Sequence, residues 1–140
     1  MNVSIEVQKA YEQAKKARLN AHAKYSKVKV GAAIKVKGSD KIFAGANVEF
    51  CVNGISVCAE RSAISASVTD VGIPEIEFVV VCSNTEPVLY PCGVCLQALS
   101  EFCSPELEIY ITTPAKIMAM TKFKDLFTHQ YSELPKVLDE

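Results

Sequence analysis

The sequence lacks the features by which polynucleotide-binding and membrane proteins are usually recognised. Its formal net charge is −1, and its one basic stretch, residues 15–18, falls in a helical pattern that predicts a solvated helix face. No apolar stretch is long enough to span a membrane, and no basic region followed by an apolar run marks a signal peptide at the N-terminus. We therefore expect a cytoplasmic protein that binds a small molecule, with no nucleic acid and no membrane as partner.

Internal repeats, low-complexity tracts and linkers are also absent. The 140 residues suit a single domain, 1–140, with a hydrophobic core that needs no disulfides. In a reducing cytosol, clustered cysteines indicate metal binding or catalysis before disulfides. Three of the six cysteines, Cys51, Cys82 and Cys103, lie outside the clusters and are interpreted as small core residues. The two histidines, His22 and His129, are remote from the clusters and are interpreted as surface or core residues.

Helical and strand patterns alternate along the chain. The expected helices cover residues 4–22, 58–69, 92–102 and 122–127, and the expected strands cover 28–36, 42–48, 76–82, 107–112 and 117–120. The first two strands form an antiparallel hairpin, and the alternation after residue 58 implies parallel pairing there. We predict an α/β fold, a mixed sheet of about five strands with helices on both faces. The segment after residue 131 is expected to lack regular structure.

Two cysteine motifs are the most informative feature of the sequence. They read Cys58-Ala59-Glu60-Arg61 and Pro91-Cys92-Gly93-Val94-Cys95. The spacing of Cys92 and Cys95 puts both sulfurs on one face of a first helical turn, and Cys58 begins another predicted helix. The positive ends of both helices would favour thiolates. Three thiolates leave a tetrahedral zinc ion one open position, as a catalytic site requires.

The residues after Cys58 suggest an acid–base role beside the metal. Glu60 lies two positions past Cys58, and residues at this spacing in a helix do not face the same side, so both are not expected to bind the metal. We therefore interpret Glu60 as a carrier of protons to and from a water molecule. Arg61 is either a hydrogen-bond donor that offsets the thiolate charge or a surface residue of the helix. A structural zinc site is the alternative, and Cys51 or Cys103 would then be the fourth ligand.

These motifs resemble those of zinc-dependent nucleobase deaminases. The chain as a whole, from about Tyr25 to Tyr131, resembles the small cytidine deaminases that use three cysteine ligands. The resemblance further rests on Tyr25-Ser26-Lys27, Val30-Gly31-Ala32-Ala33, Asn47-Val48-Glu49, Ala63 and Leu96-Gln97. The N-x-E motif at Asn47 and Glu49 narrows the resemblance to enzymes that act on free nucleosides.

The resemblance implies hydrolytic deamination of cytidine and 2'-deoxycytidine in pyrimidine salvage. One zinc ion per subunit would be held by Cys58, Cys92 and Cys95. Glu60 would take a proton from the attacking water and pass protons to N3 and to the departing amine. Asn47 and Glu49, at alternate positions of a strand, would hold the ribose hydroxyls, and the backbone N–H of Ala59 would help hold the base. A homotetramer is implied, and Tyr131 falls where the family often has a Phe that reaches into a neighbouring subunit's site.

The chain departs from the family pattern on the substrate side. Val28 stands where the family usually has a Phe that packs on the pyrimidine, Leu96 stands in place of an Arg, and Asn53 stands where an aromatic residue is common. Val28 and the loop before Cys58 leave a second hypothesis open, a deaminase of another aminopyrimidine nucleoside such as blasticidin S, whereas the N-x-E motif and Tyr131 favour cytidine. A third hypothesis is a non-catalytic, zinc-stabilised binding protein, although such a protein has no use for Glu60.

Overall fold

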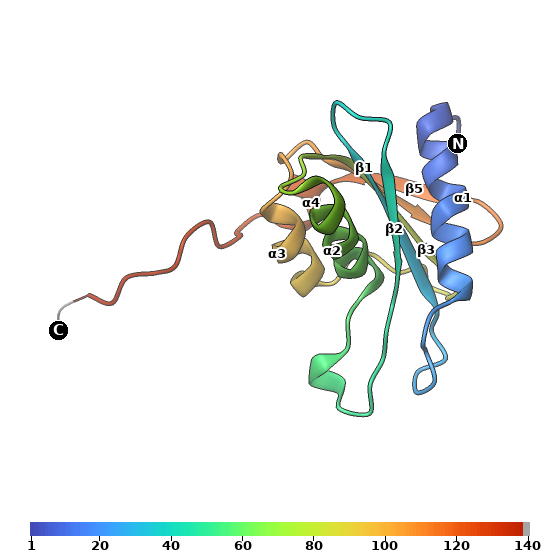
Figure 1. The fold of residues 1–140 in the computed structure, drawn as a ribbon, viewed down its shortest axis with the longest axis horizontal. Helices are drawn as coiled ribbons and strands as arrows, with labels where there is room; N and C mark the ends of the chain where they lie inside the picture. The colour runs from blue at the N-terminus through green and yellow to red at the C-terminus, as the bar shows by residue number, and fades with distance from the viewer. Residues whose placement is uncertain (139–140) are drawn as a thin grey trace.

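The computed structural model describes residues 1–138, and the last two residues of the predicted domain lie outside them. A five-stranded sheet in the order β2-β1-β3-β4-β5 forms the centre of the fold (Figure 1). The strands are β1 (Val30–Val36), β2 (Ile42–Ala46), β3 (Ile76–Ser83), β4 (Glu108–Thr112) and β5 (Ile117–Lys122). The helices are α1 (Ile5–Leu19), the short 3-10 turn η1 (Asn53–Ile55), α2 (Ala59–Val71), α3 (Gly93–Ser100) and α4 (Phe123–Leu126).

Strand pairing makes the sheet mixed, as predicted. β1 pairs antiparallel with both β2 and β3, and β3 pairs parallel with β4. β5 then pairs antiparallel with β4, so the parallel pairing expected after residue 58 holds only for β3 and β4. The reason is the connection between β4 and β5: it is too short to contain the crossover helix that a parallel pair needs.

Helices cover both faces of the sheet. α1 lies on one face, and α2 and α3 lie on the other (Figure 1). Alternate residues of β3 serve the two layers: Val79 and Val81 pack toward α2 and α3, while Val80 and Cys82 pack toward α1. Because both faces are buried, the strand reads as a continuous apolar run in the sequence.

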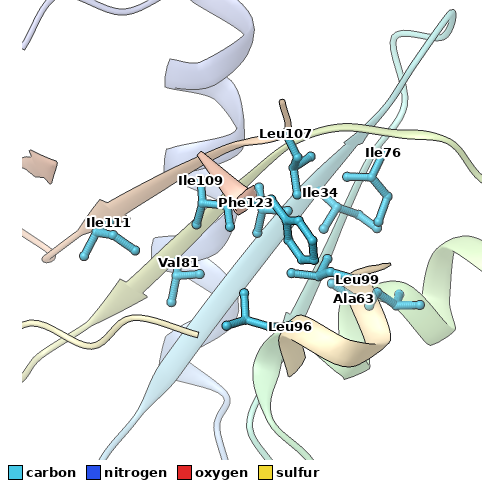
Figure 2. Close-up of a cluster of buried hydrophobic side chains, with 12 residues drawn as sticks. Ile34, Ala63, Ile76, Val81, Leu96, Leu99, Leu107, Ile109, Ile111 and Phe123 are labelled. Carbon is cyan, nitrogen blue, oxygen red and sulfur yellow. The ribbon is translucent and has the colours of Figure 1, made fainter. Parts of the chain in front are cut away.

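The larger core cluster joins α2 and α3 to the sheet. Its buried members include Ala63 of α2 and Leu96 and Leu99 of α3, which meet isoleucine and valine side chains of β1, β3 and β4 (Figure 2). α2 also approaches the edge strand β2 closely. A Cβ added at Gly45 would lie 2.6 Å from the carbonyl oxygen of Ala59, so the helix is seated directly on the strand backbone.

Several element ends differ from the predicted ones. Ser4 caps α1 by accepting a hydrogen bond from Val7 N, but the helix ends at Leu19 rather than His22, where the chain turns to form an isolated bridge with Val48. Cys51 is exposed, so its interpretation as a core residue was wrong. It lies on the segment between β2 and α2, which extends away from the sheet (Figure 1).

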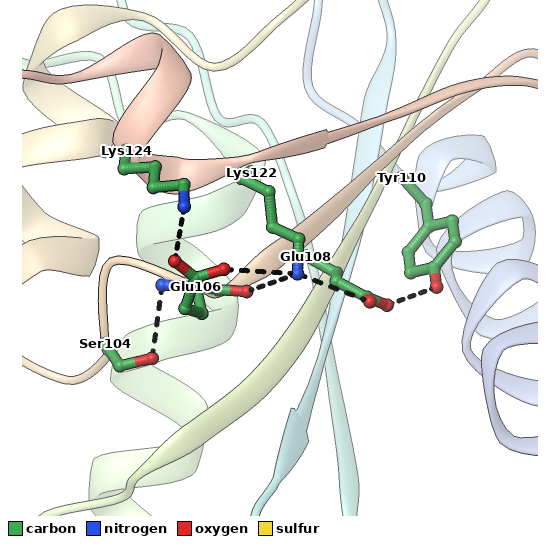
Figure 3. A network of polar contacts seen from close by, with 6 residues as sticks. All are labelled: Ser104, Glu106, Glu108, Tyr110, Lys122 and Lys124. Carbon is green, nitrogen blue, oxygen red and sulfur yellow. Dashed lines mark hydrogen bonds and ion pairs between the residues drawn. The ribbon is translucent and has the colours of Figure 1, made fainter.

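Ion pairs link the end of β5 and the start of α4 to residues at the start of β4. Lys122 lies 3.5 Å from Glu106 and 3.8 Å from Glu108, and Lys124 pairs with Glu106 (Figure 3). The hydroxyl of Tyr110 donates to Glu108. These groups join strand residues to the first residues of α4, so they hold the edge of the sheet in register.

Within residues 1–138, no helix combines the length and the apolar character needed to cross a membrane.

Candidate active site

The starts of two helices bring three cysteines together. Cys58 is the N-cap of α2, Cys92 is the N-cap of α3, and Cys95 lies in the first turn of α3. Their sulfur atoms all lie within 4.8 Å of one another, and the Cys58 and Cys92 sulfurs are 4.0 Å apart. Both helices therefore direct the positive ends of their dipoles at the sulfurs, which favours thiolates.

The cluster fits a zinc ion. Zn–S bonds of about 2.3 Å in tetrahedral geometry separate the sulfurs by about 3.8 Å, close to the distance between Cys58 and Cys92. No other Cys, His, Asp or Glu of the described chain joins the three sulfurs. Cys51 is exposed on its loop, and Cys103 packs against the core cluster. The donor set thus has three thiolates and leaves a fourth position open, unlike a closed structural site.

The cysteines of the cluster differ in how readily they lose a proton. A hydrogen bond from the Cys95 thiol, helped by Arg61, lowers the pKa of Cys58 to about 5. The same contact with Cys58, together with burial, raises the pKa of Cys95. Neighbouring thiolates repel one another, so ionising all three requires a cation among them. The guanidinium of Arg61 contributes part of that charge, because its Nη2 donates to Cys58 Sγ at 3.8 Å and to Ser56 O at 3.2 Å.

Glu60 is a buried carboxyl group beside the sulfurs. Its side chain comes from the first turn of α2 and only 4% of the residue is exposed. Burial raises the pKa of Glu60 above its ordinary value, and the negative charge of Cys58 adds to this effect. A raised pKa makes the carboxylate a stronger base, which suits a group that accepts and returns protons in general acid–base catalysis.

A cavity of about 230 Å³ opens onto Glu60 and two of the three cysteines, Cys58 and Cys92. Its lining residues come from five separate parts of the chain: Val30, Asn47, Cys58, Ala59, Glu60, Val81, Leu89, Tyr90 and Cys92. It thus has a polar side and an apolar side, as expected of a site for a small planar ligand. A larger surface cavity of about 460 Å³ lies between α3 and the C-terminal segment and contains none of the cysteines.

Asn47 lines the cavity and also bonds to the backbone at the start of β1. Its side-chain oxygen accepts from Val30 N at 2.8 Å, and its side-chain nitrogen donates to Val28 O at 2.8 Å. These bonds fix the backbone of residues 28–30 and leave one N–H of the amide free to donate into the cavity.

Three other residues singled out from the sequence do not line this cavity: Val28, Glu49 and Tyr131. Glu49 accepts a hydrogen bond from Ser26 N at 3.3 Å, and its carbonyl oxygen lies 2.6 Å from His22 Nδ1. Tyr131 is 72% exposed, and its backbone is held by Gln97 of α3 through two hydrogen bonds of 3.0 and 3.1 Å.

Sequence reasoning missed the two residues before Pro91. Leu89 and Tyr90 line the cavity, and their position next to the Pro91–Cys95 motif is the one signal that could have indicated them. His22, interpreted from the sequence as a surface or core residue, contacts the backbone of Glu49 and does not line the cavity.

Comparisons with known proteins agree with this geometry. The family model described as the cytidine and deoxycytidylate deaminase zinc-binding region matches residues 4–111. A cytidine deaminase of Sporosarcina psychrophila is 36% identical over 108 residues, which cover 77% of this chain and 78% of that protein. The crystal structure of a cytidine deaminase from Burkholderia pseudomallei has 34% identity and a TM-score of 0.81, and the match covers 89% of this chain and 98% of that one. One from Mycobacterium tuberculosis has 27% identity and a TM-score of 0.77, with 93% and 100% covered.

Proposed function

The chain belongs to the cytidine and deoxycytidylate deaminase family, and we propose that it hydrolyses cytidine and 2'-deoxycytidine to uridine and 2'-deoxyuridine. The observation that carries this proposal is a small cavity lined by a buried carboxyl group, Glu60, and by two cysteines, Cys58 and Cys92, whose sulfurs cluster with that of Cys95. The similarity to proteins named cytidine deaminases supports the choice of substrate.

Cys58, Cys92 and Cys95 would hold one zinc ion per subunit. When bound, zinc supplies the positive charge that activates a water molecule for attack and keeps the three thiolates ionised. Arg61 supports the ligands by donating to the sulfur of Cys58. Its positive charge would partly offset the negative charge of the three thiolate ligands.

Glu60 moves the protons of the reaction. Its carboxylate accepts a proton from the attacking water, whose oxygen forms a bond to C4 of the pyrimidine. It passes this proton to N3, then takes the second proton of the former water from the new C4 hydroxyl and gives it to the amino nitrogen, so that the C4–N bond breaks and ammonia and the uridine product leave. Burial of Glu60 serves both steps. It raises the pKa of the carboxyl group, which makes the carboxylate a better base, and it keeps bulk water away from the transferred proton.

The nucleoside is held by polar groups around the cavity. The free N–H of the Asn47 amide and the carboxylate of Glu49 bind the ribose hydroxyls, and the backbone N–H of the fully buried Ala59 helps hold the base. Glu49 does not line the cavity itself but lies two residues after Asn47, which does. Ser26 N and His22 fix the position of Glu49. Val28 contributes its backbone, which Asn47 holds, rather than a packing surface.

The active enzyme is a homotetramer of the cytoplasm that serves pyrimidine salvage. Tyr131 completes the site of a neighbouring subunit, which accords with its high exposure and with the hold of Gln97 on its backbone. The free thiol ligands suit a reducing compartment.

Blasticidin S remains the second candidate substrate, favoured by Val28 and by the atypical loop before Cys58. Both candidates are tested by incubating the zinc-loaded protein with cytidine, 2'-deoxycytidine and blasticidin S in parallel and following ammonia release. Fast turnover of the first two substrates is expected. Turnover of blasticidin S alone would support the same mechanism with blasticidin S as the substrate. No turnover of any of the three compounds would favour a zinc-stabilised binding protein.

A further inference from the structure

Part of the wall of the candidate site is formed by the segment just before the second cysteine motif. Leu89 and Tyr90 immediately precede Pro91 and Cys92, and both line the cavity that contains Glu60. Among the residues that line it, Tyr90 is the only aromatic side chain. The zinc ligand Cys92 is two residues away, so the position of Tyr90 is tied to the metal site through a short segment that contains a proline.

The walls of the cavity differ in burial. Val81 and Ala59 form its inner part and are 2% and 0% exposed, whereas Leu89 and Tyr90 are 36% and 47% exposed and form its mouth. Within residues 1–138 the Tyr90 hydroxyl has no hydrogen-bond partner, and its ring belongs to neither hydrophobic core cluster. The packing of this chain therefore does not account for the aromatic ring at the mouth.

The polar groups of the cavity orient a ligand but do not cover its ring faces. Glu60 and Asn47 present hydrogen-bonding groups, which recognise the edges of a base and the hydroxyls of a sugar. A flat heteroaromatic ring also requires a packing surface, and the aliphatic side chains of Val30 and Val81 provide one from the sheet. The other large apolar side chains of the lining are those of Leu89 and Tyr90, which are more exposed.

We propose that Tyr90 is a specificity-determining residue whose ring packs against the exposed face of the pyrimidine and holds it over Glu60. This inference rests on the proposed function, since it assumes that an aminopyrimidine nucleoside is the ligand. Aromatic rings pack well on other flat rings and gain more than the buried area alone provides. Leu89 extends the same wall, and the free hydroxyl of Tyr90 is not needed for the contact.

A binding experiment tests this contact without requiring turnover. The chain contains no tryptophan, so the substitution Tyr90→Trp places a single tryptophan at the mouth of the cavity. Titration with uridine, the product, is expected to change the tryptophan fluorescence saturably in zinc-loaded protein. The control is Ile73→Trp, which places the tryptophan at a residue that is 88% exposed and does not line the cavity. An unchanged emission from the Tyr90→Trp variant at uridine concentrations in the millimolar range would overturn the proposal.

Steady-state kinetics provide the second readout. Tyr90→Phe keeps the ring and is expected to keep the KM for cytidine within about twofold of the wild-type value. Tyr90→Ala removes the ring and should raise the KM about three- to tenfold, with a smaller change in kcat and unchanged zinc content. Ile73→Ala is the matched control and should leave the KM unchanged. An unaltered KM in Tyr90→Ala would contradict the proposal, as would equal losses in Tyr90→Phe and Tyr90→Ala.

The two proposals fail in different ways. If the wild-type protein released no ammonia from cytidine, the proposed function would be refuted, and the fluorescence titration would still decide whether Tyr90 contacts a nucleoside. If the wild-type protein is active and the Tyr90 variants behave like Ile73→Ala, the function stands and the role of Tyr90 is refuted.

Discussion

Cys58 and Glu60 serve the same cavity although they lie only two residues apart. Within a helix, side chains at this spacing diverge by about 200°. Cys58, however, is the N-cap and has extended backbone, with φ −72° and ψ 156°, so its side chain does not follow the helical direction. Glu60 lies inside the first turn and is buried. The helix start therefore allows the proposed metal ligand, Cys58, and the proposed proton carrier, Glu60, to be close in sequence and separate in role.

The ligand role of Cys92 gives the first prediction. Cys92→Ala removes one of three sulfurs, so we expect the zinc content to fall from about one per chain to near zero, with a loss of thermal stability because metal binding contributes to folding. Elemental analysis measures the zinc. Cys51→Ala is the matched control, because Cys51 is exposed and outside the cluster. Full zinc occupancy in Cys92→Ala would refute its assignment as a ligand.

Glu49 gives a prediction about the sugar. Glu49→Ala should raise the KM for cytidine about 10- to 100-fold, because a hydrogen bond to a charged group contributes about 1.5–3 kcal/mol. Glu12→Ala, on the surface of α1, is the control and should have no effect on KM, since Glu12 bonds to the exposed side chains of Gln8 and Lys15 and does not line the cavity. If the KM of the Glu49→Ala variant matched that of the wild type, the ribose contact would be wrong.

At the scale of elements, the position of α2 depends on Gly45 of β2. A Cβ at this residue would meet the backbone of Ala63 and would lie 2.6 Å from Ala59 O, which belongs to the turn that carries Glu60. Gly45→Ala should therefore displace α2 and reduce the free energy of unfolding by about 1–3 kcal/mol, together with a loss of activity. Urea denaturation measures the change.

The control for that substitution lies in the same region of the chain. An added Cβ at Gly54 would meet no atom within 4 Å, so Gly54→Ala should leave the free energy of unfolding nearly unchanged. Equal stability of the Gly45→Ala and Gly54→Ala variants would show that α2 is not seated on β2 as described.

Local sequence patterns predict most of the elements and the cysteine cluster, and they fail where distant segments meet. The apolar run of β3 and the cap at Ser4 are local features, so both could be read from the sequence. The antiparallel direction of β5 depends on the absence of a crossover, and the exposure of Cys51 depends on a loop that leaves the sheet. Tyr90 could not be assigned to the cavity, because β1, α2 and the end of β3 form the other walls.

At the scale of the whole molecule, the C-terminal segment exposes unusual apolar area. It extends away from the sheet (Figure 1), and Leu134, Val137 and Leu138 are each more than 80% exposed. Gln97, on the same helix as Cys95, holds the backbone of Tyr131 at the start of this extension. Such a segment is more stable when it packs on another subunit, which agrees with the proposed homotetramer.

Mixed assemblies test whether a neighbour completes each site. Tyr131→Ala and Glu60→Gln should each have low activity alone, and co-expression of the two should restore part of it. In a mixed tetramer, a chain with intact Glu60 receives Tyr131 from its neighbour. Sedimentation measures assembly and ammonia release measures activity. Tetramers of mixed composition without any recovered activity would contradict the contribution of the neighbouring subunit.

The most direct test of the account is a comparison of the wild-type protein with Glu60→Gln, with zinc content and cytidine turnover measured on the same samples. The substitution keeps the size of the side chain and removes its ability to carry a proton. The account predicts about one zinc per chain in both proteins and a loss of at least about 100-fold in kcat for the variant. Substantial turnover by zinc-loaded Glu60→Gln would contradict the role of Glu60 as proton carrier and with it the proposed mechanism.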